Sequence, residues 1–433
     1  MMRLLTIPLM LLTTACLAQN VNKTLSLKNC REMAVESSED LQKADNDIQK
    51  AELDMKIAQM SNRPMVDGSL TGLYTKDMEI MGNELQLRGM YLAGITVQQP
   101  IYTGGQITAG KRLAKIGKEC AEEVRRKSRA DIIAQTDEAY YSLLAVDEKV
   151  KMLEAFQKQL QGLNDRVSIS IKAQMATKND LLRVQAKQSE IDYQIQKAKN
   201  GRQLCRIYLC NIIGVPLDTE ITLSDTAIAV TMPHDLVDDV TNRPETNLLL
   251  KAMAAGEQQI KMATSNYLPK VGLQLGYSYH GNIWLKGMTM LPDGTPYSYK
   301  QQYKGGTPLA MLAVQIPVFH WKNEIRKVKK AELDWANAQL DYNKNTKLME
   351  IEARQAVQNY SDSYRMVQTA VIGNQQADEN LRVMRNKYDN GMATMTDLLE
   401  AQALWQQARS NLIEAQTQYK ISETRYLKAI GRL

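Results

Sequence analysis

The sequence predicts a mainly helical protein that is internally duplicated, with a long helical hairpin and two β-strands in each copy. The duplication is visible in residues 175–182 (MATKNDLL), which return 217 residues later as residues 392–399 (MATMTDLL). The same offset relates residues 97–102 (VQQPIY) to residues 314–319 (VQIPVF). A period that holds over such a length indicates two copies of one structural unit.

Helix-breaking residues are missing from two long segments. No proline lies between Pro100 and Pro216 or after Pro317, and glycine is missing from residues 118–161 and 307–372. Because proline and glycine destabilise helix interiors, these segments are expected to form helices of about 60–70 residues, roughly 100 Å long. Apolar residues at coiled-coil spacing mark a narrow seam on the first helix: Leu143, Val146, Val150, Leu153, Leu160, Leu163 and Val167.

Apolar and polar residues alternate in two short segments of each copy. In the first copy, one such segment follows Pro64 and a second ends at Pro100. In the second copy, the corresponding segments begin at Pro269 and end at Pro317. An alternation of period two predicts strands of about ten residues with one apolar face.

The remaining elements connect these helices and strands. In the first copy we expect a helix over residues 25–63, a polar loop over residues 77–89 and a return helix over about residues 180–213. Residues 214–243, which contain prolines, are the predicted connector between the copies. The second copy has a longer predicted loop over residues 281–307 and a predicted return helix over residues 397–430.

The N-terminus has the features of a secretory signal. Residues 1–18 combine an early positive charge, an apolar run and a small final residue, which predicts cleavage before Gln19. A rival interpretation makes Cys16 a lipidated first residue. The predicted first repeat then occupies residues 19–240, and the predicted second repeat occupies residues 241–433.

Composition excludes several classes of function. The chain is 24% charged with a formal net charge of +6, but the charges are mixed along it, and it has only two phenylalanines and four tryptophans. Nothing therefore indicates nucleic-acid binding. The histidines lack the spacing of metal ligands, and the cysteines after the signal are interpreted as small buried hydrophobes. No catalytic constellation is visible, so neither an enzymatic activity nor a cofactor or metal is expected.

Any contact with the interior of a membrane is predicted for the strands and not for the helices. After the signal no run of 18 apolar residues occurs, so any membrane-spanning segment is expected to be a β-strand. Four strands per chain are too few to close a barrel, and an open sheet edge in lipid leaves backbone groups without partners. If the strands lie in a membrane, the chain must therefore associate with further copies. The alternative is a soluble periplasmic coiled-coil protein, an adaptor or a structural component.

Four stretches of the chain occur in a recognisable order. They are residues 25–30 (LSLKNC), 97–105 (VQQPIYTGG), 267–269 (YLP) and 387–399 (KYDNGMATMTDLL). Together, with the duplication, they resemble the TolC-like outer-membrane efflux proteins, the outer membrane factor family. The resemblance covers nearly all of the chain after the signal, and it depends on the whole set because each stretch alone is weak.

The resemblance implies a homotrimer in the cell outer membrane. Its transmembrane β-barrel would be 12-stranded, and it would continue as a 12-helix α-barrel of coiled-coil hairpins through the periplasm. It also implies a porin-like channel, the passive exit duct of a tripartite efflux or type I-like secretion system. An inner-membrane transporter and a periplasmic adaptor (membrane fusion) protein would hand substrates to this duct, which would contact outer-membrane lipid.

The repeated motif also predicts a local structure. Thr177 and Asp180 stand three residues apart at the start of the first return helix, and Thr394 and Asp397 stand three apart at the start of the second. A threonine and a carboxylate at this spacing can form a capping box, in which each side chain accepts a hydrogen bond from the other residue's backbone amide.

The resemblance assigns a functional site to the same turns. It implies a pore constriction at Asp180, Tyr388, Asp397 and Glu400, and an adaptor-docking tip at Met175, Ala176, Thr177, Gly391, Met392, Ala393 and Thr394. Copies of each acid around one axis would form a negative ring that favours cations. Mutual repulsion is expected to raise the pKa values of such clustered carboxylates.

Two turn positions depart from the family pattern. Gln174 stands where the family usually has glycine, and Ala393 stands where one TolC-type gate has an arginine. The predicted constriction therefore lacks that cationic partner. Lys178 and Arg183 are the candidates to replace it.

Overall fold

The computed structural model describes residues 23–225 and 227–433. The predicted signal peptide (residues 1–18) and Cys16 lie outside these residues. The chain divides into two compact units. The first unit holds residues up to Gln42, Lys127–Arg243 and Met349–Leu433, and the second holds Lys43–Arg126 and Pro244–Leu348.

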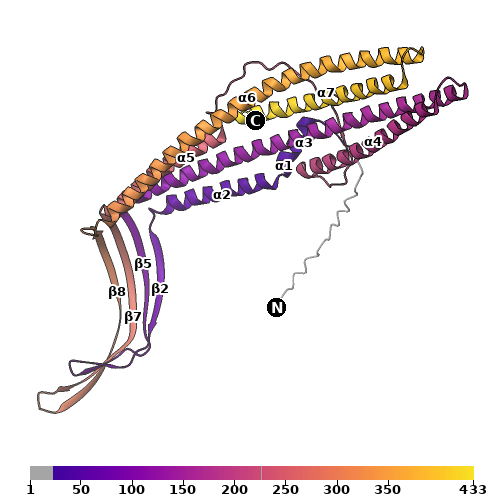
Figure 1. Cartoon of the computed structure of the whole chain (residues 1–433). Coiled ribbons are helices and arrows are strands. Elements are labelled where there is room, and N and C mark those ends of the chain that lie inside the picture. The colour runs from indigo at the N-terminus through magenta and orange to yellow at the C-terminus, as the bar shows by residue number, and fades with distance from the viewer. Residues whose placement is uncertain (1–22, 226) are drawn as a thin grey trace, which may run out of the picture. The chain divides into compact units, whose positions relative to one another are not determined.

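Two helical hairpins provide the long helices of the protein. α3 (Gln106–Lys172) turns into α4 (Lys178–Ile212), and α6 (Asn323–Asp389) turns into α7 (Met395–Ala429) (Figure 1). Each long helix has 67 residues and each return helix has 35. The prediction of two long helices with shorter return helices is confirmed.

The apolar seam of α3 is the core of the first hairpin. Leu153 and Leu160 are fully buried and pack with Val184 and Ile191 of α4. Leu398 of α7 joins the same cluster, so the two copies share one core in this unit. Burying such a seam is what stabilises helices of this length, because intrinsic helix propensity alone is weak.

The helix predicted over residues 25–63 is interrupted. α1 (Leu27–Ser37) and α2 (Glu39–Met60) are separate helices, with Ser38 between them in an extended conformation. The hydroxyl of Ser38 accepts a hydrogen bond of 3.3 Å from the amide of Leu41, which caps the start of α2. The single-helix prediction is wrong because the apolar periodicity continues across a break that a serine cap creates.

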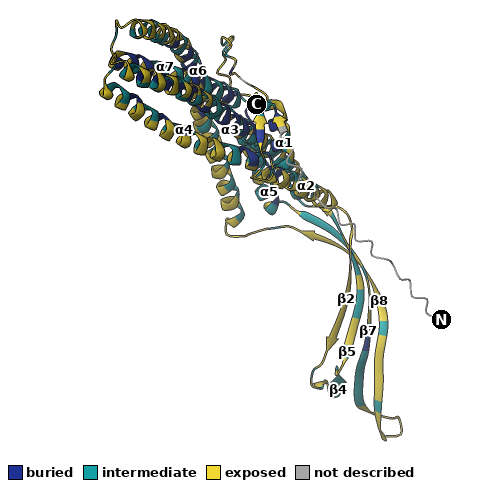
Figure 2. Ribbon diagram, turned by 90° about the vertical axis from the view of Figure 1, so that its right-hand side faces the viewer, coloured by how far each residue is buried: buried dark blue, intermediate teal, exposed yellow. Residues whose placement is uncertain are grey.

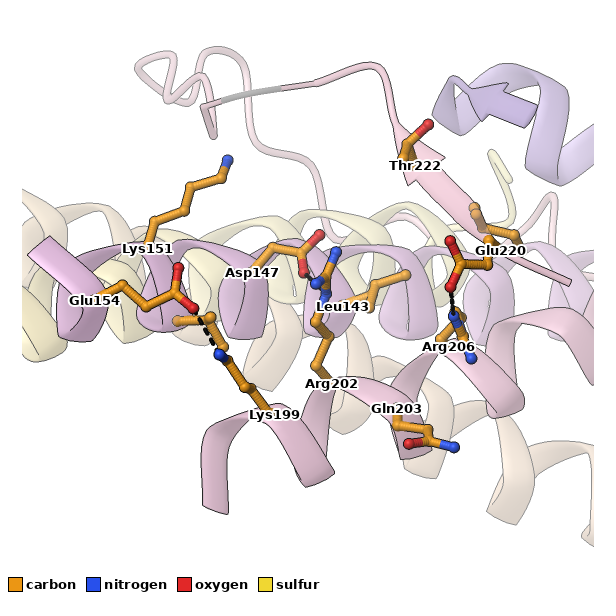
Figure 3. A pocket seen from close by; sticks show the side chains of 12 residues that line it. Leu143, Asp147, Lys151, Glu154, Lys199, Arg202, Gln203, Arg206, Glu220 and Thr222 are labelled. Carbon is orange, nitrogen blue, oxygen red and sulfur yellow. Dashed lines mark hydrogen bonds and ion pairs between the residues drawn. The ribbon is translucent and has the colours of Figure 1, made fainter. Parts of the chain in front are cut away.

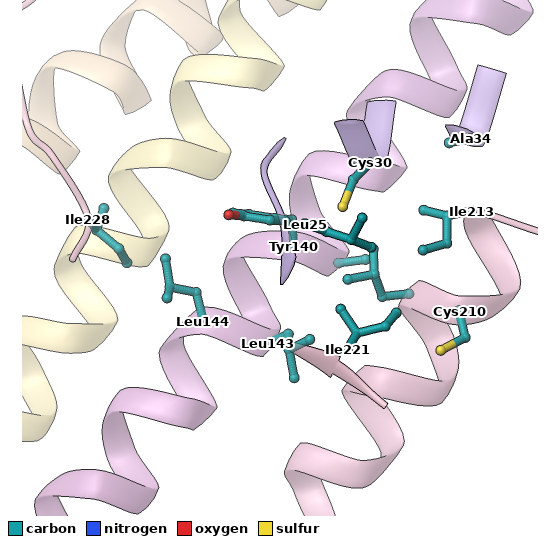
Figure 4. Packing of buried hydrophobic residues seen from close by; sticks show 12 residues of the cluster. Leu25, Cys30, Ala34, Tyr140, Leu143, Leu144, Cys210, Ile213, Ile221 and Ile228 are labelled. Atoms are coloured by element: carbon teal, nitrogen blue, oxygen red, sulfur yellow. The ribbon is translucent and has the colours of Figure 1, made fainter. Parts of the chain in front are cut away.

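A two-stranded parallel sheet joins the start of the described chain to the connector. β1 (Lys23–Leu25) pairs with β6 (Ile221–Leu223). Leu25 and Ile221 enter a buried cluster that includes Tyr140 of α3 (Figure 4). The paired strands lie 198 positions apart in the sequence, so local sequence patterns do not predict this contact.

The second unit contains an antiparallel sheet. Its long strands follow in the order β2 (Met65–Leu73), β5 (Met90–Tyr102), β7 (Lys270–Met290) and β8 (Pro296–Gln315) (Figure 1). These are the four predicted strands. Among the described residues, β2 pairs with β5 alone and β8 pairs with β7 alone, so both outer edges are open. Figure 2 shows β2 and β8 as largely exposed.

Two segments predicted as loops contain strands. Residues 77–89 include β3 (Met78–Ile80) and β4 (Asn83–Gln86), and β4 pairs with β7. Residues 281–307 extend β7 and β8 to 21 and 20 residues, well beyond the expected length. This segment contains tyrosines and a tryptophan, which favour strands. Its turn includes Gly294 in the left-handed conformation (φ +80°).

Helix α5 (Pro244–Thr264), followed by the 3-10 helix η1 (Ser265–Tyr267), leads into β7 within the second unit. At Gly256, a Cβ atom would lie 3.0 Å from the Trp335 ring of α6, so α5 and α6 approach closely there. No helix among the described residues has both the length and the apolarity needed to cross a membrane.

Candidate functional site

The turns that end the two long helices lie at the same end of the first unit (Figure 1). In the first turn, the amide of Gln174 donates to the carbonyl of Ile171 (3.0 Å), and the amide of Met175 donates to that of Ser170 (2.8 Å). This pair of bonds is a Schellman motif, which requires a left-handed residue after the helix. Gln174 occupies that position with φ +59°.

The second turn has the same hydrogen bonds. The amide of Gly391 donates to the carbonyl of Tyr388 (3.0 Å), and the amide of Met392 donates to that of Lys387 (2.7 Å). Gly391 has φ +72°, and a Cβ atom there would meet nothing within 4 Å. Gln174 therefore adopts the backbone conformation of glycine without the steric freedom of glycine.

Both return helices begin with the predicted capping boxes. A carboxylate oxygen of Asp180 accepts hydrogen bonds from the amide (3.0 Å) and the hydroxyl (2.7 Å) of Thr177, and the amide of Asp180 donates to that hydroxyl (3.2 Å). Asp397 and Thr394 form the same three bonds at 2.9, 2.7 and 3.2 Å. The capping prediction is confirmed in both copies.

The cap also sets the charge of the second acid. Hydrogen bonds from the hydroxyl and the amide of Thr394 hold the pKa of Asp397 below its ordinary value. Within one chain, Asp397 is therefore a stably ionised carboxylate. The predicted rise in pKa concerns several chains around one axis, and it stays a prediction.

Residues from the two copies meet beside Tyr388. Its side chain is half-buried, and burial is the main cause of its raised pKa. The negative charges of Asp180 and Asp389 raise this pKa further, and the positive charge of Arg166 opposes them. Arg166 lies 3.5 Å from Asp389, so an ion pair joins α3 to α6 at this point. The structure thus brings together Asp180 and Tyr388, two of the four predicted constriction residues.

The two candidate replacements for the missing arginine stay predictions. Arg183 donates a hydrogen bond to the hydroxyl of Thr396 in the second copy. The cation whose charge opposes the raised pKa of Tyr388 is Arg166, which sequence reasoning missed. Arg166 precedes the repeated motif on α3, so the motif itself gives no indication of it.

The predicted docking residues form an accessible surface. Met175 and Met392 are 83% and 71% exposed, while Ala176 and Ala393 are half-buried beside them. Glu400 is exposed on α7, and its carboxylate meets no hydrogen-bonding or ionic partner within the part of the chain that the structure describes. Of the predicted constriction acids, Glu400 is therefore the one whose charge is not engaged in a cap.

A cavity of about 530 Å³ opens between α3, α4 and β6 (Figure 3). Its charged side chains pair across it: Lys199 lies 2.8 Å from Glu154, and Arg206 lies 3.4 Å from Glu220. The first ion pair joins the return helix α4 to the long helix α3, and the second joins α4 to the connector. The lining contains no nucleophile beside a base.

A buried ion pair fastens the first unit. The Asp137 carboxylate of α3 is fully buried and accepts two hydrogen bonds from Arg31 of α1, at 2.6 and 2.5 Å. The hydroxyl of Thr424 on α7 donates to the same carboxylate at 2.6 Å. One side chain thus joins three helices. Sequence reasoning missed this site, because the three residues are far apart and share no motif.

Among residues 23–225 and 227–433, no group of three or more metal-ligating side chains occurs. The four cysteines that the structure describes are free thiols, and burial raises the pKa of Cys30 to about 12. Thiols of this kind are unreactive, because the thiolate is the nucleophilic form.

Comparisons with known proteins address the family. The family model described as outer membrane efflux protein matches residues 31–215 and 242–432. No curated protein matches the chain.

Solved structures share the fold. The Campylobacter jejuni CmeC outer membrane channel is 18% identical, with 94% of this chain and 85% of that chain covered and a TM-score of 0.75. The Vibrio cholerae outer membrane protein VceC is 17% identical, with 94% and 96% covered and a TM-score of 0.75. The open state of the Neisseria gonorrhoeae MtrE outer membrane channel is 16% identical, with 94% and 88% covered and a TM-score of 0.75.

At these identities the solved structures establish the fold alone, while the family model covers most of the chain. The resemblance to TolC-like proteins is thereby confirmed. The chain belongs to the outer membrane efflux protein family, whose members are outer-membrane channels and not enzymes.

Proposed function

We propose that the chain is the exit duct of a tripartite efflux or type I-like secretion system, through which substrates leave the cell passively. One observation carries this proposal: helices of 67 residues occur in the same chain as an antiparallel sheet with two open edges. Each helix is about 100 Å long, a length that suits a conduit across a wide aqueous space and that no globular core requires.

The open sheet edges support assembly as a homotrimer. β2 and β8 each have one neighbour in the chain, and an edge exposed to lipid would leave backbone groups without partners. Within the chain, β5 of the first copy pairs with β7 of the second. The equivalent pairing between chains joins β8 of one chain to β2 of the next chain. We divide the chain accordingly into repeats at residues 19–240 and 241–433.

The two turns support contact with a periplasmic adaptor at the docking tip defined above. Met175 and Met392 are exposed flexible side chains, and methionine adapts well to varied partner surfaces. The small residues Ala176 and Ala393 beside them allow a partner backbone to approach. An inner-membrane transporter would then deliver substrate into the duct.

The second copy is the better candidate for the gate. Asp180 and Asp397 are engaged in capping boxes, so Glu400 is the acid most able to direct its charge into a pore. Tyr388 packs against a cluster that combines side chains of the first copy with Met395 and Leu398 of the second. The neighbouring Arg166–Asp389 ion pair is the contact we assign to holding the resting closure.

Cell fractionation with gel mobility tests this function. The expected product is an outer-membrane protein that migrates as a trimer when unheated and as a monomer after boiling. A covalent adaptor–tip cross-link is expected when a photoreactive residue replaces Met175 or Met392. A soluble monomer in the periplasm would contradict the duct and would favour the alternative, a periplasmic coiled-coil adaptor.

A further inference from the structure

The segments that join strand to long helix have matching backbones in the two copies. The β5–α3 turn is residues 103–105, and the β8–α6 turn is residues 316–322. In the first, the amide of Gln106 donates to the carbonyl of Thr103 (3.1 Å); in the second, the amide of Asn323 donates to that of His320 (2.9 Å). The two pairs are related by the offset of 217 residues, so the turns can be compared position by position.

The comparison reveals a difference in residue type at the most constrained positions. The first copy has Gly104 and Gly105 with φ of +63° and +86°. The second copy has Trp321 and Lys322 at the corresponding positions, with φ of +52° and +58°. Residues that carry a side chain rarely adopt this left-handed backbone conformation, because it costs free energy. That Trp321 and Lys322 adopt it points to a function for their side chains.

The side chains of the β8–α6 turn form an exposed apolar surface. Val318, Phe319 and Trp321 are 89%, 66% and 80% exposed. The rings of Phe319 and Trp321 pack edge to face, with centroids 5.1 Å apart. Contiguous exposed apolar surface marks a contact site, and tryptophan is enriched where one end of a side chain meets an apolar medium and the other meets water.

Exposed cations follow this apolar surface along the chain: Lys322, Arg326, Lys327, Lys329 and Lys330. Lys327 and Lys329 lie 3.0 Å from Glu324 and Glu332, whereas Lys322, Arg326 and Lys330 have no acidic partner among the described residues. The first turns of a helix favour negative charge, because the helix dipole is positive at that end. Basic residues here are therefore locally unfavourable, and an anionic occupant would neutralise them.

A neighbouring chain of the proposed trimer does not neutralise these cations. Within the chain, a Cβ atom at Gly104 would lie 2.8 Å from the carbonyl of Ser265 and 2.9 Å from Leu268. By the 205-residue offset between Pro64 and Pro269, the corresponding residues of a neighbouring chain are Met60 and Arg63. Arg63 would add a further cation beside Lys322, so an anionic occupant is still needed.

We propose that the β8–α6 turn is a lipid anchor that sits in the headgroup layer of an anionic phospholipid leaflet. Trp321 and Phe319 lie at the boundary of the acyl chains, and Lys322, Arg326 and Lys330 contact headgroup phosphates. This inference rests on the proposed placement of the sheet in the outer membrane. The second repeat of the chain, and not the first, then fixes the depth of the sheet in the membrane.

Quenching of tryptophan fluorescence tests the position of Trp321. The full chain is reconstituted into phosphatidylcholine–phosphatidylglycerol vesicles that contain lipids brominated near the carbonyl. The wild type is expected to lose a larger share of its fluorescence than Trp321→Phe, because the variant lacks the residue at the quenching depth. Equal quenching of the two proteins, in vesicles with which both co-float, would overturn the anchor and leave the duct proposal intact.

The charge requirement has its own measurement and a matched control. At equal mole fraction, brominated phosphatidylglycerol is expected to quench the wild type more than brominated phosphatidylcholine does. The variant Lys322→Gln/Arg326→Gln/Lys330→Gln is expected to lose this preference. Arg112→Gln, at the first-copy equivalent of Lys329, is expected to keep this preference.

Two other outcomes would contradict the proposals. Trp321 fluorescence that responds to dissociation of the oligomer and not to lipid would identify a neighbouring chain as the occupant and refute the anchor. Failure to co-float would contradict the duct proposal as well.

Discussion

At the scale of single residues, the two hairpin turns show how one backbone is made by different side chains. Gly391 adopts the left-handed conformation freely, whereas Gln174 adopts it at φ +59°. For a residue with a Cβ atom this conformation costs about 1–2 kcal/mol. The turn persists because the Schellman bonds and the following capping box fix the residues on both sides of Gln174.

Replacing Gln174 by glycine is therefore expected to stabilise the protein. The gain is about 0.5–1 kcal/mol, since relief of backbone strain is partly offset by the greater freedom of glycine in the unfolded chain. Gly391→Ala, at the same position of the other turn, is expected to destabilise by a similar amount. Thermal unfolding in detergent measures both. A destabilised Gln174→Gly would mean that the glutamine side chain has a role that its backbone conformation does not explain.

The buried pair of Asp137 and Arg31 is asymmetric. The Asp137 side chain is 0% exposed and the Arg31 side chain is 36% exposed. Removing the arginine leaves a carboxylate that water cannot reach, whereas removing the aspartate leaves a guanidinium that can turn toward solvent.

Arg31→Ala is expected to destabilise the first unit by about 3–5 kcal/mol, because it isolates a buried charge. Asp137→Ala is expected to cost less. Arg425→Ala, which breaks the exposed pair with Glu138 (3.4 Å), is a control with an expected cost under about 1 kcal/mol. Denaturant unfolding of the three variants gives the order. Equal costs for Arg31→Ala and Arg425→Ala would show that Asp137 is not effectively buried.

At the scale of elements, the sequence predicts what local periodicity determines. The long helices, their return helices and the long strands follow from the placement of proline and glycine and from apolar spacing. The break at Ser38 was not predicted, because a serine cap leaves the apolar period unchanged. The β1–β6 pair and the Asp137 site depend on contacts between distant residues. For the tip, the caps at Thr177 and Thr394 were predictable, and the role of Arg166 was not.

The ends of the return helices depend on close approach. Gly214 follows α4 with φ +71°, and a Cβ atom there would lie 2.2 Å from Cβ of Ser37. Gly214→Ala is expected to cost about 2 kcal/mol or more, because it combines backbone strain with a steric clash. Gly162→Ala, in an α3 position with nothing within 4 Å, is expected to stabilise by about 0.5–1 kcal/mol. Unfolding midpoints measure both, and a tolerated Gly214→Ala would mean that the contact with α1 is loose.

At the scale of the whole molecule, duplication supplies the architecture and divergence supplies the function. The paired turns, caps and strands are common to both copies. Gly391, Tyr388 and Glu400 have no equivalents of the same type in the first copy, and neither do Trp321 and Lys322. We therefore place both the gate and the lipid anchor in the second copy, at opposite ends of α6.

The most direct test of the duct and its gate is the current through single channels in a planar bilayer. The wild-type protein is expected to form a cation-selective channel of low resting conductance. Asp397→Ala/Glu400→Ala is expected to raise the cation conductance, because it removes the acidic side chains that constrict the pore. Glu400→Gln alone is expected to account for most of the effect, because Asp397 is engaged in its cap. Wild-type and double-variant channels with the same conductance and the same selectivity would contradict the assignment of these residues as the constriction.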